Sequence, residues 1–170
     1  MQALIMLGKA TTTAALQGLA SNFEKLYVLT TPTVEVPQAE HVEVFRFENF
    51  HNNGKVEIKA FELVKDDPQM KVFGVSEGDV LRVSALKDIL GNGNLSFHDA
   101  LCHRNKLLMK DRASSGGISV PHYASVAVPF DVLRFVELHG LPVVVKPVTG
   151  SGGTNTVVIE NQQELSLIHI

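Results

Sequence analysis

The stretch LPVVVKPVTGSGGTNTVVI, residues 141–159, decides how the second half of the chain folds. Two runs of β-branched residues flank a loop of glycine, serine, threonine and asparagine, a pattern that predicts two strands joined by a turn. Because the connection is short, we expect the two strands to pair antiparallel. Alternation along the first strand places Lys146 on the face opposite Val143 and Val145.

Lys146 ends an otherwise apolar strand, where a buried charge is costly unless it finds a partner. The loop after it offers backbone N–H groups with few bulky side chains, and its glycines permit unusual backbone angles and the close approach of a ligand. Amide-rich loops bind anions, and a nearby ammonium adds charge. We therefore expect a phosphate site that comprises Lys146 and the loop residues Thr149, Gly150, Ser151, Gly152, Gly153 and Thr154. The alternative is a plain turn with Lys146 extended into water.

Two common nucleotide-binding motifs are absent from this stretch. The P-loop pattern, a glycine, four residues and then Gly-Lys-Ser/Thr, does not occur. GSGGTN is followed by a strand instead of a helix, so it does not fit the dinucleotide-binding fingerprint. The segment LGKATTTAAL, residues 7–16, does follow a strand and open a helix, but it contains one glycine. An NAD-type dehydrogenase is therefore disfavoured.

Outward from this stretch, the first 95 residues show strands alternating with helices. We expect strands at 3–7, 26–30, 41–47 and 71–75, and helices at 11–21 and 76–91, whereas 54–65 is ambiguous. Ser76, with Asp79 three residues on, has the pattern of a helix N-cap, and Gly91 that of a helix stop. Phe45, Phe47 and Phe50 are expected in the core or at its boundary. Such alternation predicts a small doubly wound α/β unit with a parallel sheet.

After residue 95 the pattern changes from an α/β sheet to helices and a hairpin. One helix is expected from Ser96 through residue 113, because Ser96 and Asp99 repeat the N-cap pattern. The segment 118–126 should be extended, and 130–139 should form a helix that stops at Gly140. These elements precede the predicted hairpin.

The composition indicates a globular protein. The chain has 170 residues, of which 45% are hydrophobic and 19% charged, with a formal net charge of −3. That balance gives no overall attraction to nucleic acid or to an anionic membrane. One cysteine, Cys102, excludes an internal disulfide framework and favours a cytoplasmic location. The N-terminal apolar run is interpreted as a buried strand and not as a signal peptide, and no segment is long enough to span a bilayer.

The order of features from residue 103 onward resembles the first half of an ATP-grasp ligase domain. The resemblance lies in HRNKLLMKDRASSGGISVPHYASV, a spacer helix, and then GLPVVVKPVTGSGGTNTVVI. Residues 1–95 resemble the α/β domain that precedes ATP-grasp domains, and VSEGDVLRVSALKDILGNGNLS is similar to its last part. The implied fold is a Rossmann-like pre-ATP-grasp domain at 1–95 and an incomplete ATP-grasp domain, a helix plus an antiparallel lid hairpin, at 96–164.

The resemblance implies roles for particular residues. Lys106 matches the first ATP-contacting lysine, Lys146 matches the second, and 150–154 matches the loop that closes over the phosphates. Such enzymes phosphorylate a small-molecule carboxylate with ATP and Mg²⁺, and an amine or thiol then attacks the acyl phosphate. The family's metal ligands and catalytic arginine have no counterpart in this sequence, so no catalytic or metal residue is assigned. We expect a fragment that is inactive alone and binds ATP weakly.

The last six residues, LSLIHI at 165–170, resemble the translation of a sequencing adaptor. They follow what looks like the start of a helix, so we expect them to be an artefact and the natural chain to continue.

Other residues favour simpler interpretations. Lys110, Arg104 and Arg112 most simply form a solvated helix face, since no aromatic residues alternate with them as in a nucleic-acid site. The spacing of His98, His103 and His122 does not make a metal site. Cys102 is expected to be a half-buried structural residue. The alternative function to a ligase fragment is a non-catalytic α/β binding or interaction module.

Overall fold

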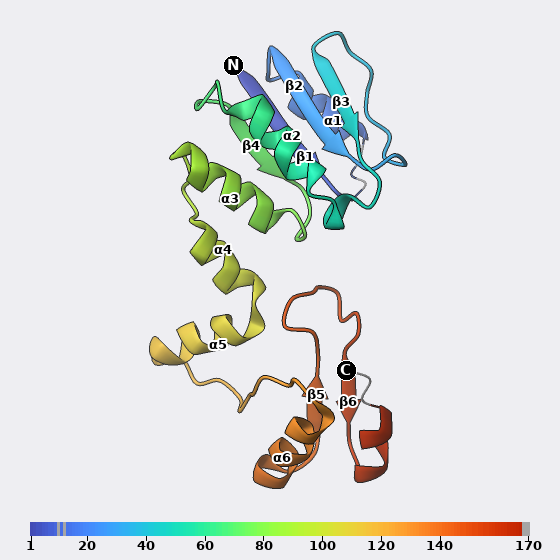
Figure 1. Ribbon diagram of the computed structural model, residues 1–170, viewed down its shortest axis with the longest axis vertical. Coiled ribbons are helices and arrows are strands. Elements are labelled where there is room, and N and C mark those ends of the chain that lie inside the picture. The colour runs from blue at the N-terminus through green and yellow to red at the C-terminus, as the bar shows by residue number, and fades with distance from the viewer. Residues whose placement is uncertain (10, 12, 168–170) are drawn as a thin grey trace. The chain divides into compact units, whose positions relative to one another are not determined.

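The computed structural model describes residues 1–9, 11 and 13–167, and it divides into two compact units, Met1–Ala100 and Leu101–Ile170. In the first unit, four strands form one parallel sheet in the order β3-β2-β1-β4 (Figure 1). The strands are β1 (Gln2–Leu7), β2 (Lys25–Thr30), β3 (Val42–Arg46) and β4 (Lys71–Gly74). The parallel α/β architecture expected from the alternating pattern is confirmed.

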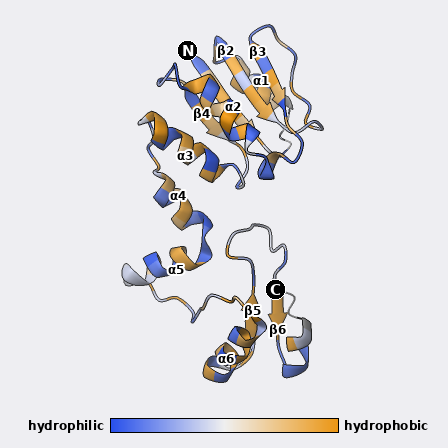
Figure 2. Cartoon of the chain, viewed as in Figure 1, coloured by the Kyte–Doolittle hydropathy of each residue, from blue (hydrophilic) through white to orange (hydrophobic). Residues whose placement is uncertain are grey.

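Helices cover both faces of this sheet, which is why its strands are apolar along most of their length (Figure 2). On one face, helix α1 (Thr13–Ala20) packs with Leu16 and Ala20 against Ile5 and Val28. The other face holds a second core, to which two further helices and a short 3₁₀ turn contribute. These elements are α2 (Lys55–Val64), α3 (Val80–Leu90) and η1 (Phe50–Asn52).

The ambiguous segment 54–65 forms helix α2. Its buried residues, Val56, Ala60 and Val64, recur every four positions and form one stripe that faces the core. Phe50 is also buried in this core, and Phe45 and Phe47 pack against its edge, as expected.

Helix α3 begins later than the sequence pattern predicts. Its N-cap is Asp79 and not Ser76, because residues 76–79 form a turn in which the Asp79 N–H donates to the Ser76 carbonyl. The Ser76 hydroxyl donates to the Asp79 carboxylate at 2.6 Å, and the Gly8 N–H donates to the same oxygen at 3.2 Å. Gly91 ends the helix with a φ of 67°, as predicted.

The single helix expected from Ser96 to residue 113 is wrong, because the chain forms two helices, α4 (Phe97–Arg104) and α5 (Lys106–Ser115). The predicted cap at Ser96 is confirmed, since its hydroxyl accepts the Asp99 N–H at 3.0 Å. The break lies at Asn105, whose extended backbone and side-chain oxygen cap the start of α5. Asparagine competes with the helix backbone in this way because its short amide reaches nearby N–H groups.

The second unit continues with α6 (Pro129–His139) and an antiparallel hairpin, β5 (Val143–Val145) and β6 (Val157–Ile159). The antiparallel pairing is confirmed. Helix α6 lies beside the hairpin (Figure 1), and its Val132 packs with Val143 and Ile159 in a small core. The strands have three residues each, so the loop between them is longer than predicted.

A 3₁₀ helix, η2 (Gln162–Leu167), follows the hairpin, and its Leu165 packs against the same small core. The predicted adaptor-derived tail, 165–170, therefore begins inside η2, and residues 168–170 of that tail lie outside the described residues. Within the described part of the chain, no helix has both the length and the apolar character needed to cross a membrane.

Candidate functional site

A cavity of about 960 Å³ lies in the second unit between α5, the segment 121–126, α6 and the hairpin. Its charged side chains are three lysines, His122, Tyr123, Ser125 and Asn155 are its other polar residues, and valines and Phe135 contribute to its apolar wall. The lining residues are Lys106, Leu107, Lys110, Pro121, His122, Tyr123, Ala124, Ser125, Val126, Val132, Phe135, Pro142, Val143, Val144, Val145, Lys146, Pro147, Val148, Asn155 and Val157.

Lys106 is held against the start of the glycine loop. As the first residue of α5, it follows the Asn105 cap, and its backbone N–H donates to the Val148 carbonyl at 3.0 Å. Its ammonium donates to the carbonyl of Gly150 at 3.2 Å and that of Val148 at 3.5 Å. The structure thus brings the helix-borne lysine and the loop together across more than forty residues of sequence.

Lys146, expected to end a buried strand, lies one residue beyond β5 and is exposed. The predicted alternation is nevertheless correct: Val143 is 8% exposed, whereas Val144 is 55% exposed. Lys146 shares the open face with Val144, where its charge stays in water at little cost. From that position it lines the same cavity as Lys106.

The loop residues from Thr149 to Thr154 are exposed and do not line the cavity themselves. Gly152 and Gly153 have φ values of 66° and 73°, a left-handed conformation that few other residues adopt. Asn155 shares this conformation, with a φ of 56°, and does line the cavity. Asparagine tolerates left-handed backbone better than most residues, which is the signal that could have identified this position.

Sequence reasoning missed Lys110, which it assigned to a solvated helix face. Lys110 is half-buried, lines the cavity, and places its ammonium 4.9 Å from the centre of the Tyr123 ring. The Tyr123 hydroxyl donates a hydrogen bond to Asp111, and this bond raises the pKa of Tyr123. The four-residue spacing from Lys106 was the available signal, since residues so spaced share a helix face.

His122 lies on the same segment as Tyr123 and stacks on His139 of α6, with ring centres 4.2 Å apart and an interplanar angle of 19°. This contact ties the irregular segment to α6, while Tyr123 ties it to α5. Both contacts position one wall of the cavity.

The cavity suits a polyanion. It is lined by three lysines and by no aspartate or glutamate, and none of these lysines forms an ion pair with the residues that the structure describes. The phosphates of ATP fit such a lining. The described residues do not fit Mg²⁺ in the same way, since they contain no group of three or more His, Cys, Asp or Glu side chains that could hold a metal ion. No chemical step is therefore assigned to a metal here.

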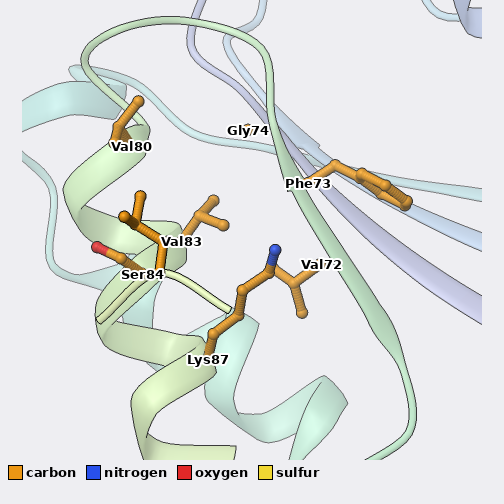
Figure 3. Close-up of a pocket in the computed structure, with 8 residues that line it drawn as sticks. Val72, Phe73, Gly74, Val80, Val83, Ser84 and Lys87 are labelled. Carbon is orange, nitrogen blue, oxygen red and sulfur yellow. The ribbon is translucent and has the colours of Figure 1, made fainter. Parts of the chain in front are cut away.

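The first unit has a smaller cavity of about 240 Å³, between β4 and α3 (Figure 3). Its lining is mostly apolar, with Val72, Phe73 and Val83 prominent, and it includes none of the predicted site residues.

Cys102, a residue of helix α4 that was expected to be half-buried, is buried.

No family model matches this chain, but comparison with known proteins identifies similar sequences and structures. The L-arginine-specific L-amino acid ligase of Bacillus subtilis is 32% identical over 100 residues, which cover 59% of this chain and 24% of that protein. The chain thus spans about a quarter of the length of this curated relative.

Solved structures match over nearly the whole chain. The L-amino acid ligase of Bacillus licheniformis gives a TM-score of 0.72 at 18% identity, covering 98% of this chain and 40% of that one. The N5-carboxyaminoimidazole synthetase of Staphylococcus aureus, complexed with ADP, gives 0.69 at 19% identity, covering 98% and 43%. At these identities the structures show a shared fold. The chain is thus similar in sequence to an L-amino acid ligase, and it shares its fold with a ligase and a synthetase of which it covers 40% and 43%.

Proposed function

We propose that this chain is the N-terminal portion of an ATP-dependent ligase that joins a carboxylate to an amine or thiol through an acyl phosphate. In this proposal, residues 1–95 are the domain that precedes the ATP-grasp domain, and 96–164 are the first part of its lid. The observation that supports it best is the shared cavity of Lys106 and Lys146, with the Lys106 ammonium bound to carbonyls at the start of the glycine loop.

The proposed role of this portion is to bind and orient the nucleotide phosphates. Bound ATP would supply the phosphoryl group that activates the carboxylate. The two lysines come from separate elements, so they can contact a polyphosphate from two sides and offset its charge. The glycine loop, Gly150, Ser151, Gly152, Gly153, Thr149 and Thr154, would add backbone N–H groups and hydroxyls. We propose that ATP binding breaks the hydrogen bonds between the Lys106 ammonium and the carbonyls at the start of the loop. The loop would then contact the phosphates.

The substrate class is proposed from the curated relative. Its name states specificity for L-arginine among L-amino acid ligases. An amino acid provides both a carboxylate and an amine, the two groups that a carboxylate–amine ligase joins. We therefore propose amino acids as substrates of the enzyme to which this portion belongs.

Isothermal titration calorimetry with ATP tests the phosphate site on the 170-residue chain. We expect weak binding, which Lys146→Met and Lys106→Met each reduce about tenfold, corresponding to about 1.4 kcal/mol. Lys65→Met is the matched control, because Lys65 is an exposed lysine of the first unit and should leave binding unchanged.

Two outcomes would contradict the proposal. Equal affinity of the Lys146→Met variant and the unaltered chain would favour a non-catalytic α/β module with a plain glycine turn. Tight binding that depends on Mg²⁺ would contradict the expectation that the metal ligands lie outside these residues.

A further inference from the structure

Lys110 is placed on the same face of α5 as Lys106. The two lysines are four residues apart, so one turn of helix separates them and both line the cavity. Both are half-buried, in contrast to the exposed Lys146. A partly buried ammonium loses hydration, and a chain retains one more easily where an anion compensates it.

Tyr123 fixes where the Lys110 ammonium lies. The tyrosine ring is 4.9 Å from the Lys110 ammonium, within the range of a cation–π interaction. Its hydroxyl donates to Asp111, the next residue of the helix. The ring is therefore bound at its face and at its hydroxyl by consecutive residues of α5. This hydrogen bond with Asp111 raises the pKa of Tyr123.

The contact with Tyr123 leaves the charge of Lys110 uncompensated. A cation–π contact attracts the ammonium but does not neutralise it. The nearest carboxylate along the helix, Asp111, accepts the Tyr123 hydroxyl, and Lys110 forms no ion pair with any residue in the described ranges. Its ammonium is thus held beside the Tyr123 ring, in a residue that lines the cavity, and is available to an anion there.

We propose that Lys110 is a third cation of the nucleotide site, that Tyr123 is its positioning residue, and that this cation makes the cavity prefer triphosphates over monophosphates. The inference rests on the proposed function, because it assigns Lys110 to the same phosphate site. Two lysines suffice to hold a short phosphate group. A third ammonium one helical turn further along α5 adds affinity only for a ligand whose negative charge extends that far.

The test compares three ligands on the full chain: ATP, AMP and inorganic tripolyphosphate. Titrations at low and high salt measure affinity and its salt dependence for Lys110→Met, Lys110→Arg, Tyr123→Ala and Tyr123→Phe. We expect Lys110→Met to weaken ATP and tripolyphosphate about tenfold and AMP less than about threefold, with a shallower salt dependence. Lys110→Arg should restore most of the affinity, because it keeps the charge.

The tyrosine variants separate positioning from folding. Tyr123→Ala removes the ring and should reduce the preference for triphosphates as Lys110→Met does, whereas Tyr123→Phe keeps the ring and should retain that preference. Circular dichroism checks that each variant is folded. If Tyr123→Ala unfolds, the lysine variants still decide the inference.

The results distinguish the two proposals. If the unaltered chain binds tripolyphosphate and Lys146→Met weakens it, but Lys110→Met changes neither affinity nor selectivity, the third cation is refuted and the proposed function stands. If the unaltered chain binds neither ATP nor tripolyphosphate, the proposed function fails and this inference fails with it.

Discussion

Lys106 occupies a position that local helix energetics disfavour. It is the first residue of α5, where the partial positive charge of the helix dipole repels a cation, at a typical cost of 0.3–1 kcal/mol, about the worth of a weak hydrogen bond. Carbonyl contacts with Val148 and Gly150 compensate part of this cost. A residue that local preferences do not explain is a better indicator of a ligand site than one that fits its helix.

Asp131 makes the stability of α6 depend on pH. Its carboxylate accepts the backbone N–H groups of Ala127 and Val128, at 2.9 and 3.0 Å, and these bonds lower its pKa. A carboxyl with a depressed folded pKa stabilises the fold above its unfolded pKa of about 3.9, and this stabilisation disappears as the pH falls through the lower folded value. Asp131→Asn should therefore lower the Tm by a few degrees at neutral pH.

The same variant should melt like the unaltered chain once the pH lies below the folded pKa of Asp131. Thermal melts followed by circular dichroism across the acid range provide the check. A difference between the two proteins that persists undiminished in strong acid would mean that Asp131 acts through something other than its charge.

Gly74 is required by close packing at the end of β4. A Cβ placed there would lie 3.0 Å from the Val83 side chain and 3.1 Å from the Cβ of Asp79, both of which are buried. We expect Gly74→Ala to destabilise the first unit by about 1–3 kcal/mol, measured by urea denaturation. Gly18→Ala is the control: that glycine is exposed inside α1 with open space around it, so alanine should stabilise by about 0.5–1 kcal/mol. Equal effects of the two substitutions would refute the packing argument.

Among the elements, the β5–β6 hairpin packs against the rest of its unit through one face only. Ile159 is fully buried against Val132 and Val143, whereas the neighbouring Val158 is 51% exposed. Ile159→Ala should destabilise the second unit by about 2–5 kcal/mol, because it leaves a cavity in a core of few residues. Val158→Ala should change stability by less than about 0.5 kcal/mol. Hydrogen exchange of the β5 and β6 amides measures both, and comparable loss of protection in the two variants would contradict this assignment of faces.

The sequence predicted those elements whose signal is local and periodic. Strands of the parallel sheet, helix α3 and the hairpin followed from apolar spacing and from glycine stops such as Gly91 and Gly140. The break between α4 and α5 did not, because Asn105 lies inside a helical pattern and its capping role depends on one rotamer and one backbone angle. The start of helix α3 was predicted at Ser76 and not at Asp79, because the position of a cap likewise depends on local backbone angles.

The candidate site was predictable only in part. The positions of Lys106 and the loop were suggested by a family resemblance, and the structure brings them into contact. The pairing of Lys110 with Tyr123 joins residues of a helix and an irregular segment, for which no periodicity exists. Such contacts depend on tertiary packing, which single-sequence patterns do not encode.

For the whole molecule, the distribution of buried residues separates two kinds of unit. The first unit has a sheet with a core on each face, and these two cores contain buried residues such as Leu4 and Ile5, respectively. The second has one small core around Val132 and a two-stranded hairpin. The stability of a unit increases with the apolar area that it buries, and an isolated two-stranded hairpin is only marginally stable in water. The second unit should therefore open first as temperature rises.

Separate cores predict separate unfolding events. Gly74→Ala should lower the stability of the first unit alone, and Ile159→Ala that of the second alone, because the two residues share no packing partner in the three cores. Effects at independent sites add within about 0.3–0.5 kcal/mol, so the double variant should show both losses, each confined to its own unit. Hydrogen exchange read peptide by peptide along the chain distinguishes the units in one experiment. If either single substitution reduced protection equally in 1–100 and 101–167, the chain would unfold as one cooperative block, and the division into two units would not describe its energetics.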